Sequence, residues 1–430
     1  MAGFLDLLRR NRNYRYTWLG QIVSEVGDHF NTVAVFSLAL ANTGSGLVVS
    51  GLMISRAVPM ILAGPLAGVL LDRMDRKRLM IASDLVRAVV AALFVLATGP
   101  ERTWLLYVLS ALLMFASPFF TSGRAAILPA ITTPEELHTA NSLTKTTQWT
   151  ALTAGAMLGG AAAMKFGYQG AFIFNALSFL FSAACIAKLH TAGGFRPART
   201  ALDESQVLRP WHEYVEGLRY MRSVPLLLAI GLVHVGWASG GGAAQILFTL
   251  FGEVVYPYGP AGMGTIWGFA GLGLLAGGTL ANAVGARLSF DRLKRLIAVC
   301  FAVHGLAYIA FSQARPFWLV LVFVALSRAG MGVTAILNTT LLLRHVPDAY
   351  RGRVFATIES LVWAVMMVSM AAAGYASGYW DPRTIGAVAG ILSSTTALIW
   401  LTADWKGWLV EPPPVGVERE EVEVHDHPTV

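Results

Sequence analysis

The sequence has little charge. Of its 430 residues, 13% are Asp, Glu, Lys or Arg, whereas 55% are hydrophobic. A soluble globular domain normally has about 25% charged residues, because charged side chains cover its surface. A chain of this length would form two or three soluble domains, and it has too few polar residues to cover them. Most of the chain is therefore expected to face lipid or other buried helices.

Cysteine and nucleotide-binding motifs are also scarce or absent. Cys185 and Cys300 are the two cysteines, both lie inside apolar runs, and their spacing fits neither a disulfide framework nor a metal site. We interpret them as small core residues. The sequence has no G-x-x-x-x-G-K-[ST] run, which would bind the phosphates of a nucleotide. We therefore expect no metal, no cofactor and no use of ATP.

What the sequence has in quantity is long apolar runs. A hydrocarbon core of about 30 Å is crossed by roughly 20 helical residues. Lipid cannot satisfy backbone N–H and C=O groups, so a span must be a helix or part of a closed barrel, and no short alternating strands are visible. We predict an all-α membrane protein with twelve transmembrane helices at 16–41, 48–71, 79–98, 104–129, 140–164, 168–189, 224–250, 262–284, 295–313, 316–342, 354–379 and 384–405.

The positive charges indicate how these spans are oriented. Of the 32 Lys and Arg residues, 23 lie at the termini, loops or helix ends on one side of the predicted membrane, and the other side has only Arg102, Lys165, Arg315 and Arg383. Under the positive-inside rule both termini are cytoplasmic, and the protein is expected in the cell (inner or plasma) membrane. The net charge of +7 is divided among short loops without a basic, aromatic-rich patch, so no nucleic acid is expected as a partner.

An internal repeat divides the chain. The run Gly64-Pro65-Leu66-Ala67-Gly68 aligns with Leu274-Leu275-Ala276-Gly277-Gly278. We predict five segments: a cytoplasmic N-terminal segment 1–15, a six-helix bundle 16–189, a cytoplasmic linker 190–223, a second six-helix bundle 224–405 and an acidic disordered tail 406–430. Within the linker, 211–222 alternates aromatic and charged residues, as an interfacial amphipathic helix does.

A short charged loop between the second and third spans carries the most specific pattern. Six of the seven residues 72–78 are charged and cannot lie in hydrocarbon, and Gly68 before them is expected to let two helices approach closely. The run Gly68-Val69-Leu70-Leu71-Asp72-Arg73-Met74-Asp75-Arg76-Lys77-Arg78 resembles the G-x-x-x-D-R-x-G-R-[RK] signature of the major facilitator superfamily. Asp75 stands where that signature has its second glycine.

This resemblance implies a conformational gate. In a two-half transporter the loop meets the cytoplasmic start of helix 11, here near Arg353. Free N–H groups and the helix dipole favour a carboxylate there by roughly 0.3–1 kcal/mol. We expect Asp72 to dock at this start and latch the outward-facing state, with Arg73, Arg76 and Lys77 organising the loop. Positive-inside topology alone is the alternative, and it explains the basic residues but not Asp72.

Charged residues inside the spans are the next signal. A charge near the bilayer centre costs at least about 2.5–3.5 kcal/mol, so it should face the bundle interior or a water-filled cavity. Glu25, Asp28 and Asn31 follow each other at three-residue spacing and form one polar stripe on helix 1. We expect Asp28, and less strongly Glu25, to couple transport to protons, with Arg56 of helix 2 as the partner of Asp28. The alternative is a structural ion pair that never titrates.

Other polar residues in the spans are assigned more general roles. Arg328, in the middle of helix 10, is a candidate contact for an anionic substrate or a carboxylate, and Glu359 lies near the start of helix 11. Asp84, Arg87 and Arg124 are expected to lie near the cytoplasmic surface and to brace the Asp72 loop. The intramembrane histidines His234 and His304 have no metal spacing and are expected to be packed, hydrogen-bonded core residues.

A glycine-rich run lies in helix 5. Gly155-Ala156-Met157-Leu158-Gly159-Gly160 resembles the antiporter motif G-P-x-x-G-G of drug exporters, with Ala156 in place of proline. Such glycines permit close helix packing. The run is therefore compatible with ordinary packing as well as with an exporter.

Taken over the whole membrane region, the chain resembles the drug:proton antiporter branch of the major facilitator superfamily, with macrolide efflux proteins and siderophore exporters. The resemblance implies proton-coupled efflux of amphipathic small molecules by alternating access, by a monomer and without enzymatic activity. Export of a siderophore, a peptide antibiotic or a metal chelate, or flipping of lysophospholipid, are the alternatives. A membrane enzyme would need a catalytic cluster of His or Asp at a membrane face, and a sensor would need a folded soluble domain; the sequence has neither.

Overall fold

The structure is a computed structural model of the chain, and it describes residues 4–190, 194–195, 210–285 and 287–411. In this part of the chain the secondary structure is helical and contains no β-strand. Ten of the described helices are long and apolar enough to cross a membrane. The prediction of an all-α membrane protein is therefore confirmed, and the chain is a multi-pass membrane protein.

The chain forms two compact units. The first unit contains Met1–Leu202, Gln245–Leu272 and Met370–Ile385, and the second contains Asp203–Ala244, Gly273–Ser369 and Gly386–Val430. The first unit is thus larger than the predicted N-terminal bundle, because end segments of several later helices pack with it.

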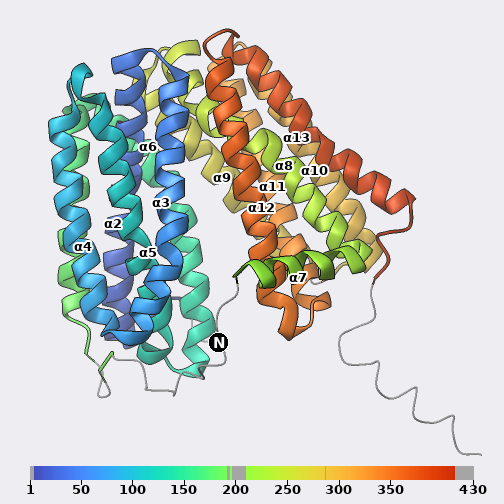
Figure 1. The fold of residues 1–430 in the computed structure, drawn as a ribbon, viewed down its shortest axis with the longest axis horizontal. Helices are drawn as coiled ribbons and strands as arrows, with labels where there is room; N and C mark the ends of the chain where they lie inside the picture. Colours follow the sequence, from blue (N-terminus) through green and yellow to red (C-terminus); the bar gives the residue numbers. More distant parts are fainter. Residues whose placement is uncertain (1–3, 191–193, 196–209, 286, 412–430) are drawn as a thin grey trace, which may run out of the picture. The chain divides into compact units, whose positions relative to one another are not determined.

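The first unit is built mainly from the N-terminal helices (Figure 1). Within it α2 packs along α6, α3 packs along α5, and α4 contacts both α5 and α6. Its elements are α1 (Phe4–Arg10), α2 (Arg12–Thr43), α3 (Gly46–Arg73), α4 (Arg76–Leu93), the 3-10 turns η1 (Phe94–Ala97) and η2 (Pro100–Arg102), α5 (Thr103–Ile131) and α6 (Pro134–Ala187).

Helix α6 has 54 residues because it joins two helices end to end. It begins with a capping box, in which the Thr133 hydroxyl accepts from the Glu136 N–H and the Glu136 carboxylate accepts from the Thr133 N–H. Gly167 interrupts it with φ 72° and ψ 171°. Glycine adopts a positive φ without steric cost, and this break falls between the fifth and sixth predicted spans.

The second unit is built from the later helices (Figure 1). Its apolar core includes Leu227, Ile230, Ile297, Leu337 and Trp400, which come from four helices. The elements that follow α6 are α7 (Pro210–Ser223), α8 (Pro225–Leu250), the π-turn η3 (Phe251–Val255), α9 (Gly259–Gly285), α10 (Phe290–Gln313), α11 (Phe317–His345), α12 (Asp348–Ala376) and α13 (Pro382–Trp405).

Helix α7 is the amphipathic linker helix that the sequence predicts, and it packs on the start of α12 in the second unit (Figure 1). The rings of Tyr220 and Tyr350 stack with centroids 4.5 Å apart and planes 5° apart. Burial raises the pKa of the Tyr220 phenol. Gly217 lets the two backbones approach, since a Cβ atom there would lie 2.8 Å from the carbonyl oxygen of Arg353. The linker helix is therefore a packed part of the second unit.

Candidate functional site

Six charged side chains on α2, α3, α4 and α5 of the first unit are here called the membrane charge cluster: Glu25, Asp28, Arg56, Asp84, Arg87 and Arg124. Glu25 on α2 forms an ion pair with Arg124 on α5, with 3.1 Å between Oε1 and Nη1. Gln21, one turn before Glu25, donates to the same oxygen at 3.0 Å. The expectation that Arg124 braces the Asp72 loop is wrong, because its guanidinium turns inward to the Glu25 carboxylate.

A second ion pair joins Asp84 and Arg87, which lie one turn apart on α4. Both side chains are buried, with 0% and 3% of their surface exposed. The guanidinium also lies 4.6 Å from the ring centroid of Phe120 and 4.3 Å from that of Phe179, an arrangement that favours a cation. This pair therefore belongs to the interior of the unit, and the expectation that it braces the loop is also wrong.

The structure does not join Arg56 to Asp28. Arg56 donates from Nη2 to the Thr32 hydroxyl at 3.0 Å, and this hydroxyl donates to the backbone carbonyl of Asp28 at 2.7 Å. No ion pair within 4.0 Å connects the two charged side chains in the described residues. The predicted direct pairing is wrong because Thr32 lies at the depth of Arg56, counted from the connection between α2 and α3, whereas Asp28 lies one turn deeper.

Asp28 is consequently left with few compensating contacts. Its Oδ1 atom is buried and has no hydrogen-bond partner in the described structure, and the same holds for both polar side-chain atoms of Asn31. Arg87 and Arg56 interact with its carboxylate at longer range. Buried polar atoms without partners are rare in native proteins, and each calls for an explanation. Of the two carboxylates in the polar stripe expected on helix 1, Asp28 therefore has fewer hydrogen-bond and ion-pair partners than Glu25.

Basic side chains fix the charged loop between α3 and α4. Arg76 donates from Nη1 to the carbonyl of Ala126 at 2.9 Å, near the end of α5. Lys77 donates to the carbonyl of Leu189 at 2.8 Å, just after α6. These two residues fix the loop by binding carbonyl groups near the ends of neighbouring helices. Such ends attract cations.

The acidic residues of this loop have separate roles. Asp75, the departure from the family signature, accepts from the N–H of Arg78 at 3.0 Å and caps α4. Asp72 is 67% exposed, with Arg76 at 4.0 Å. A Cβ atom on Gly68 would meet nothing within 4 Å. Gly68 therefore does not pack closely against another helix in this structure, and the expectation that it does is wrong.

In the second unit, Arg353 has a partner that the sequence did not indicate. Its Nη1 atom lies 2.8 Å from the Glu216 carboxylate of α7. Both side chains are about one-third exposed. Glu359, two turns further along α12, is exposed. The start of α12 is thus contacted by the linker helix, and the signal available in the sequence was the amphipathic pattern of 211–222.

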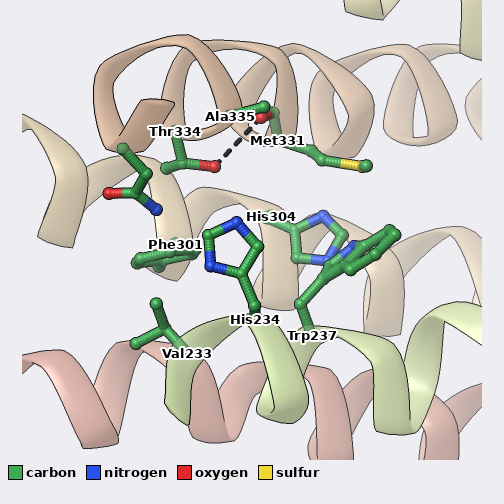
Figure 2. Close-up of a pocket in the computed structure, with 9 residues that line it drawn as sticks. Val233, His234, Trp237, Phe301, His304, Met331, Thr334 and Ala335 are labelled. Atoms are coloured by element: carbon green, nitrogen blue, oxygen red, sulfur yellow. Dashed lines mark hydrogen bonds between the residues drawn. The ribbon is translucent and has the colours of Figure 1, made fainter. Parts of the chain in front are cut away.

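The second unit also contains a cavity of about 210 Å³ between α8, α10 and α11 (Figure 2). Arg328 is buried beside it and donates to the sulfur of Met331 at 3.3 Å. His304 is hydrogen-bonded through both ring nitrogens, to the hydroxyls of Ser327 and Ser393 at 2.9 Å each. The prediction of a packed, hydrogen-bonded histidine is confirmed for His304. The lining residues are Val233, His234, Trp237, Phe301, His304, Met331, Thr334, Ala335 and Asn338.

The glycine run of α6 makes close backbone contacts. A Cβ atom on Gly155 would lie 3.0 Å from the Cβ of His29, and one on Gly159 would lie 2.9 Å from the Cα of Phe30. Gly160 faces the carbonyl of Pro260 at the start of α9 even more closely. At these three glycines the helices of the first unit therefore approach too closely for a larger side chain.

One intramembrane carboxylate was missed in the sequence. Glu253 lies in the π-turn η3 and accepts a short hydrogen bond from the hydroxyl of Ser37 on α2. In the same unit Arg383 donates to the Tyr256 hydroxyl at 3.2 Å. A single Glu at the end of an apolar run was the signal available, and π-turns are frequent at functional sites.

Comparisons with known proteins identify the family to which this architecture belongs. The family model described as Major Facilitator Superfamily matches residues 17–358. "Uncharacterized MFS-type transporter YfiS" of Bacillus subtilis (strain 168) is 27% identical over 403 residues, which are 92% of this chain and 94% of that protein. "Multidrug efflux pump Tap" of Mycolicibacterium fortuitum is 27% identical over 366 residues, 82% of this chain and 86% of that protein.

The fold agrees with that of a solved transporter. The crystal structure of the nucleoside transporter NupG superposes with a TM-score of 0.69, covering 91% of this chain and 99% of that chain at 11% sequence identity. At such low sequence identity, the similarity shows a shared fold and nothing about function. The relatives are transporters rather than enzymes, and the chain belongs to the Major Facilitator Superfamily.

Proposed function

We propose that this protein is a proton-coupled exporter of amphipathic small molecules that works by alternating access. The observation that carries the proposal is the membrane charge cluster, in which Asp28 is the carboxylate with fewest contacts. A carboxylate held in this way can exchange a proton at low cost, because neither form is fixed by a direct ion pair. The name of the relative Tap, a multidrug efflux pump, supports drug-type substrates.

The proposal includes twelve membrane helices in two six-helix halves. Helix α6 supplies two spans on either side of Gly167. Helix α2, with 32 residues, is long enough for one more. Together with the other long helices these supply the twelve predicted from the sequence. The distribution of Lys and Arg supports cytoplasmic termini in a plasma membrane.

In the proposed cycle, Asp28 takes up a proton from the outer side as substrate leaves, and releases it to the cytoplasm as the next substrate binds. Glu25 and Arg124 form the neighbouring ion pair. A proton on Glu25 would weaken that pair and free the guanidinium, so Glu25 is a second coupling candidate. Asp72 and Arg353 remain the proposed gate, with Asp72 docking at the start of α12 in the outward-facing state.

Transport in proteoliposomes tests the proposal. The full chain is reconstituted with ethidium as the probe, and an imposed pH gradient drives its movement. We expect Asp28→Asn to lose gradient-driven accumulation but to keep downhill exchange. Glu101→Gln, which changes an exposed carboxylate of the same unit, serves as the matched control and should behave as the wild type. An Asp28→Asn protein that still concentrates ethidium would exclude Asp28 as the coupling residue.

A further inference from the structure

The cavity of the second unit has the size and the lining of a ligand site. Its volume of about 210 Å³ lies below the roughly 300–1,000 Å³ of pockets that hold whole drug-sized ligands, so it suits one or two fused rings. Val233 and Phe301 are buried and apolar, whereas Ala335 is exposed. The cavity is therefore enclosed on the α8 and α10 sides and opens beside Ala335 on α11.

His234 supplies a hydrogen-bond acceptor to this cavity. Figure 2 shows its imidazole projecting from α8 between Phe301 and His304. The Nδ1 atom lies 2.7 Å from the carbonyl oxygen of Ile230, one turn earlier on the same helix. A carbonyl can only accept, so Nδ1 carries the proton, and in a neutral imidazole Nε2 then carries the lone pair.

Two further polar groups in the wall have no partner in the described structure. They are the indole N–H of Trp237 and the side-chain oxygen of Asn338, which is 2% exposed. Leaving such a group unsatisfied costs about 1–3 kcal/mol. Native cores rarely carry this cost without a function. Both atoms are themselves buried behind the cavity surface, so the acceptor that the cavity offers directly is Nε2 of His234.

The remaining polar groups of the wall are already engaged. Thr334 donates to the carbonyl of Met331 at 3.0 Å, the dashed line in Figure 2. Both ring nitrogens of His304 bond to serine hydroxyls. The ligand chemistry is consequently set by Nε2 of His234 and by the apolar wall around it. An aromatic hydroxyl matches this chemistry, because it donates to the acceptor while its ring fills the apolar space.

We propose that this cavity binds the ring of a phenolic compound, with the hydroxyl donating to Nε2 of His234. The proposal rests on the proposed function, since it names the substrate class of the exporter, but binding itself needs no proton gradient. The two can therefore fail separately: an Asp28→Asn protein should still prefer the phenol to the same ring without a hydroxyl hydrogen, because that preference is set at His234.

Equilibrium dialysis on the full chain in lipid nanodiscs tests the assignment, with naphthol and its methyl ether as probes and protein-free nanodiscs as the blank. The ether keeps the rings but cannot donate. We expect naphthol to bind about tenfold more tightly than the ether, as one buried hydrogen bond allows. His234→Phe should remove that preference, and His234→Gln, which keeps an acceptor, should retain part of it.

A second pair of variants tests the location. Ala335→Phe should narrow the opening and weaken both probes at least fivefold. Thr339→Phe, exposed one turn further along α11 and outside the cavity wall, is the matched control and should leave both affinities unchanged. Thermal unfolding verifies that each variant is folded. Equal affinity for the two probes, a preference that survives in His234→Phe, or wild-type binding by Ala335→Phe would each overturn the proposal.

Discussion

Glu25 and Arg124 are 99 residues apart in the sequence, and their side chains form an ion pair of 3.1 Å inside the first unit. Their exposed side-chain fractions are 19% and 8%. Removing one partner of a pair in such surroundings leaves the other charge uncompensated and costs roughly 3–5 kcal/mol when burial is complete. This pair is therefore expected to hold α2 against α5 as well as to influence the charge of the cluster.

A double-mutant cycle tests that expectation. Glu25→Gln and Arg124→Gln should each lower the free energy of unfolding, and the double variant should lose less than the sum of the two. The expected coupling is about 0.5–3 kcal/mol. The measurement is thermal unfolding in detergent, with Arg102→Gln, an exposed residue before α5, as the control. Additive losses would contradict an energetic role for the contact.

Arg56 should be coupled to Thr32 more strongly than to Asp28. The structure gives Arg56 a 3.0 Å hydrogen bond to the Thr32 hydroxyl and no ion pair with Asp28. Thr32→Val keeps the shape of the side chain and removes the acceptor. In stability cycles with Arg56→Gln, we expect the Thr32 cycle to show a coupling of about 0.5–1.5 kcal/mol and the Asp28 cycle to show less. The opposite order would mean that the two charges meet directly.

The contrast between these two contacts shows what the sequence could predict. The presence of long apolar helices was predictable because hydrocarbon thickness imposes a length, and the break at Gly167 falls where two predicted spans meet. The pairing of Arg124 with Glu25 was not, because it depends on which helices lie side by side and on the rotation of each. Composition and spacing carry no information on either. The same reason explains Glu216, whose partner Arg353 lies in a distant part of the sequence.

Asp75 should act through helix capping rather than through the gate. Asp75→Ala removes the side chain that accepts from the N–H of Arg78, and the loss of such a cap costs about 0.5–2 kcal/mol. Asp75→Gly, which restores the residue of the family signature, should lower the stability by only a few tenths of a kcal/mol. Unfolding of both variants measures the difference. The control is Asp72→Ala, because Asp72 caps no described helix and should leave stability unchanged.

Substitutions of Asp72 and Glu216 are expected to shift the balance between inward-facing and outward-facing states in opposite directions, because both carboxylates compete for the start of α12. Asp72→Asn weakens the proposed docking at α12 and should favour inward-facing states. Glu216→Gln removes the carboxylate that lies 2.8 Å from Arg353 and should favour the outward-facing state, by the roughly 0.2–1 kcal/mol of a partly exposed pair. Distances between spin labels on the two halves report this balance. Shifts of both variants in the same direction would exclude competition for the start of α12.

Two glycines of the first unit should respond oppositely to the same substitution. Gly68 lies inside α3 with open space around it, whereas Gly159 on α6 faces the backbone of Phe30, with 2.9 Å between a built Cβ and the Cα of that residue. Alanine favours a helix interior over glycine by about 0.5–1 kcal/mol. Gly68→Ala should therefore raise the thermal midpoint, and Gly159→Ala should lower it, because a backbone cannot move aside as a flexible side chain can.

The transport assay then distinguishes a role of these glycines in helix packing from a role in the moving gate. If the family signature needs Gly68 for the moving gate, Gly68→Ala should slow ethidium transport although the protein has become more stable. Gly159→Ala should slow transport in proportion to its lost stability, and it should recover at lower temperature. A Gly68→Ala protein that is both more stable and fully active would mean that this glycine serves neither packing nor the gate. The conformational role of the loop would then depend on Asp72 and its basic neighbours alone.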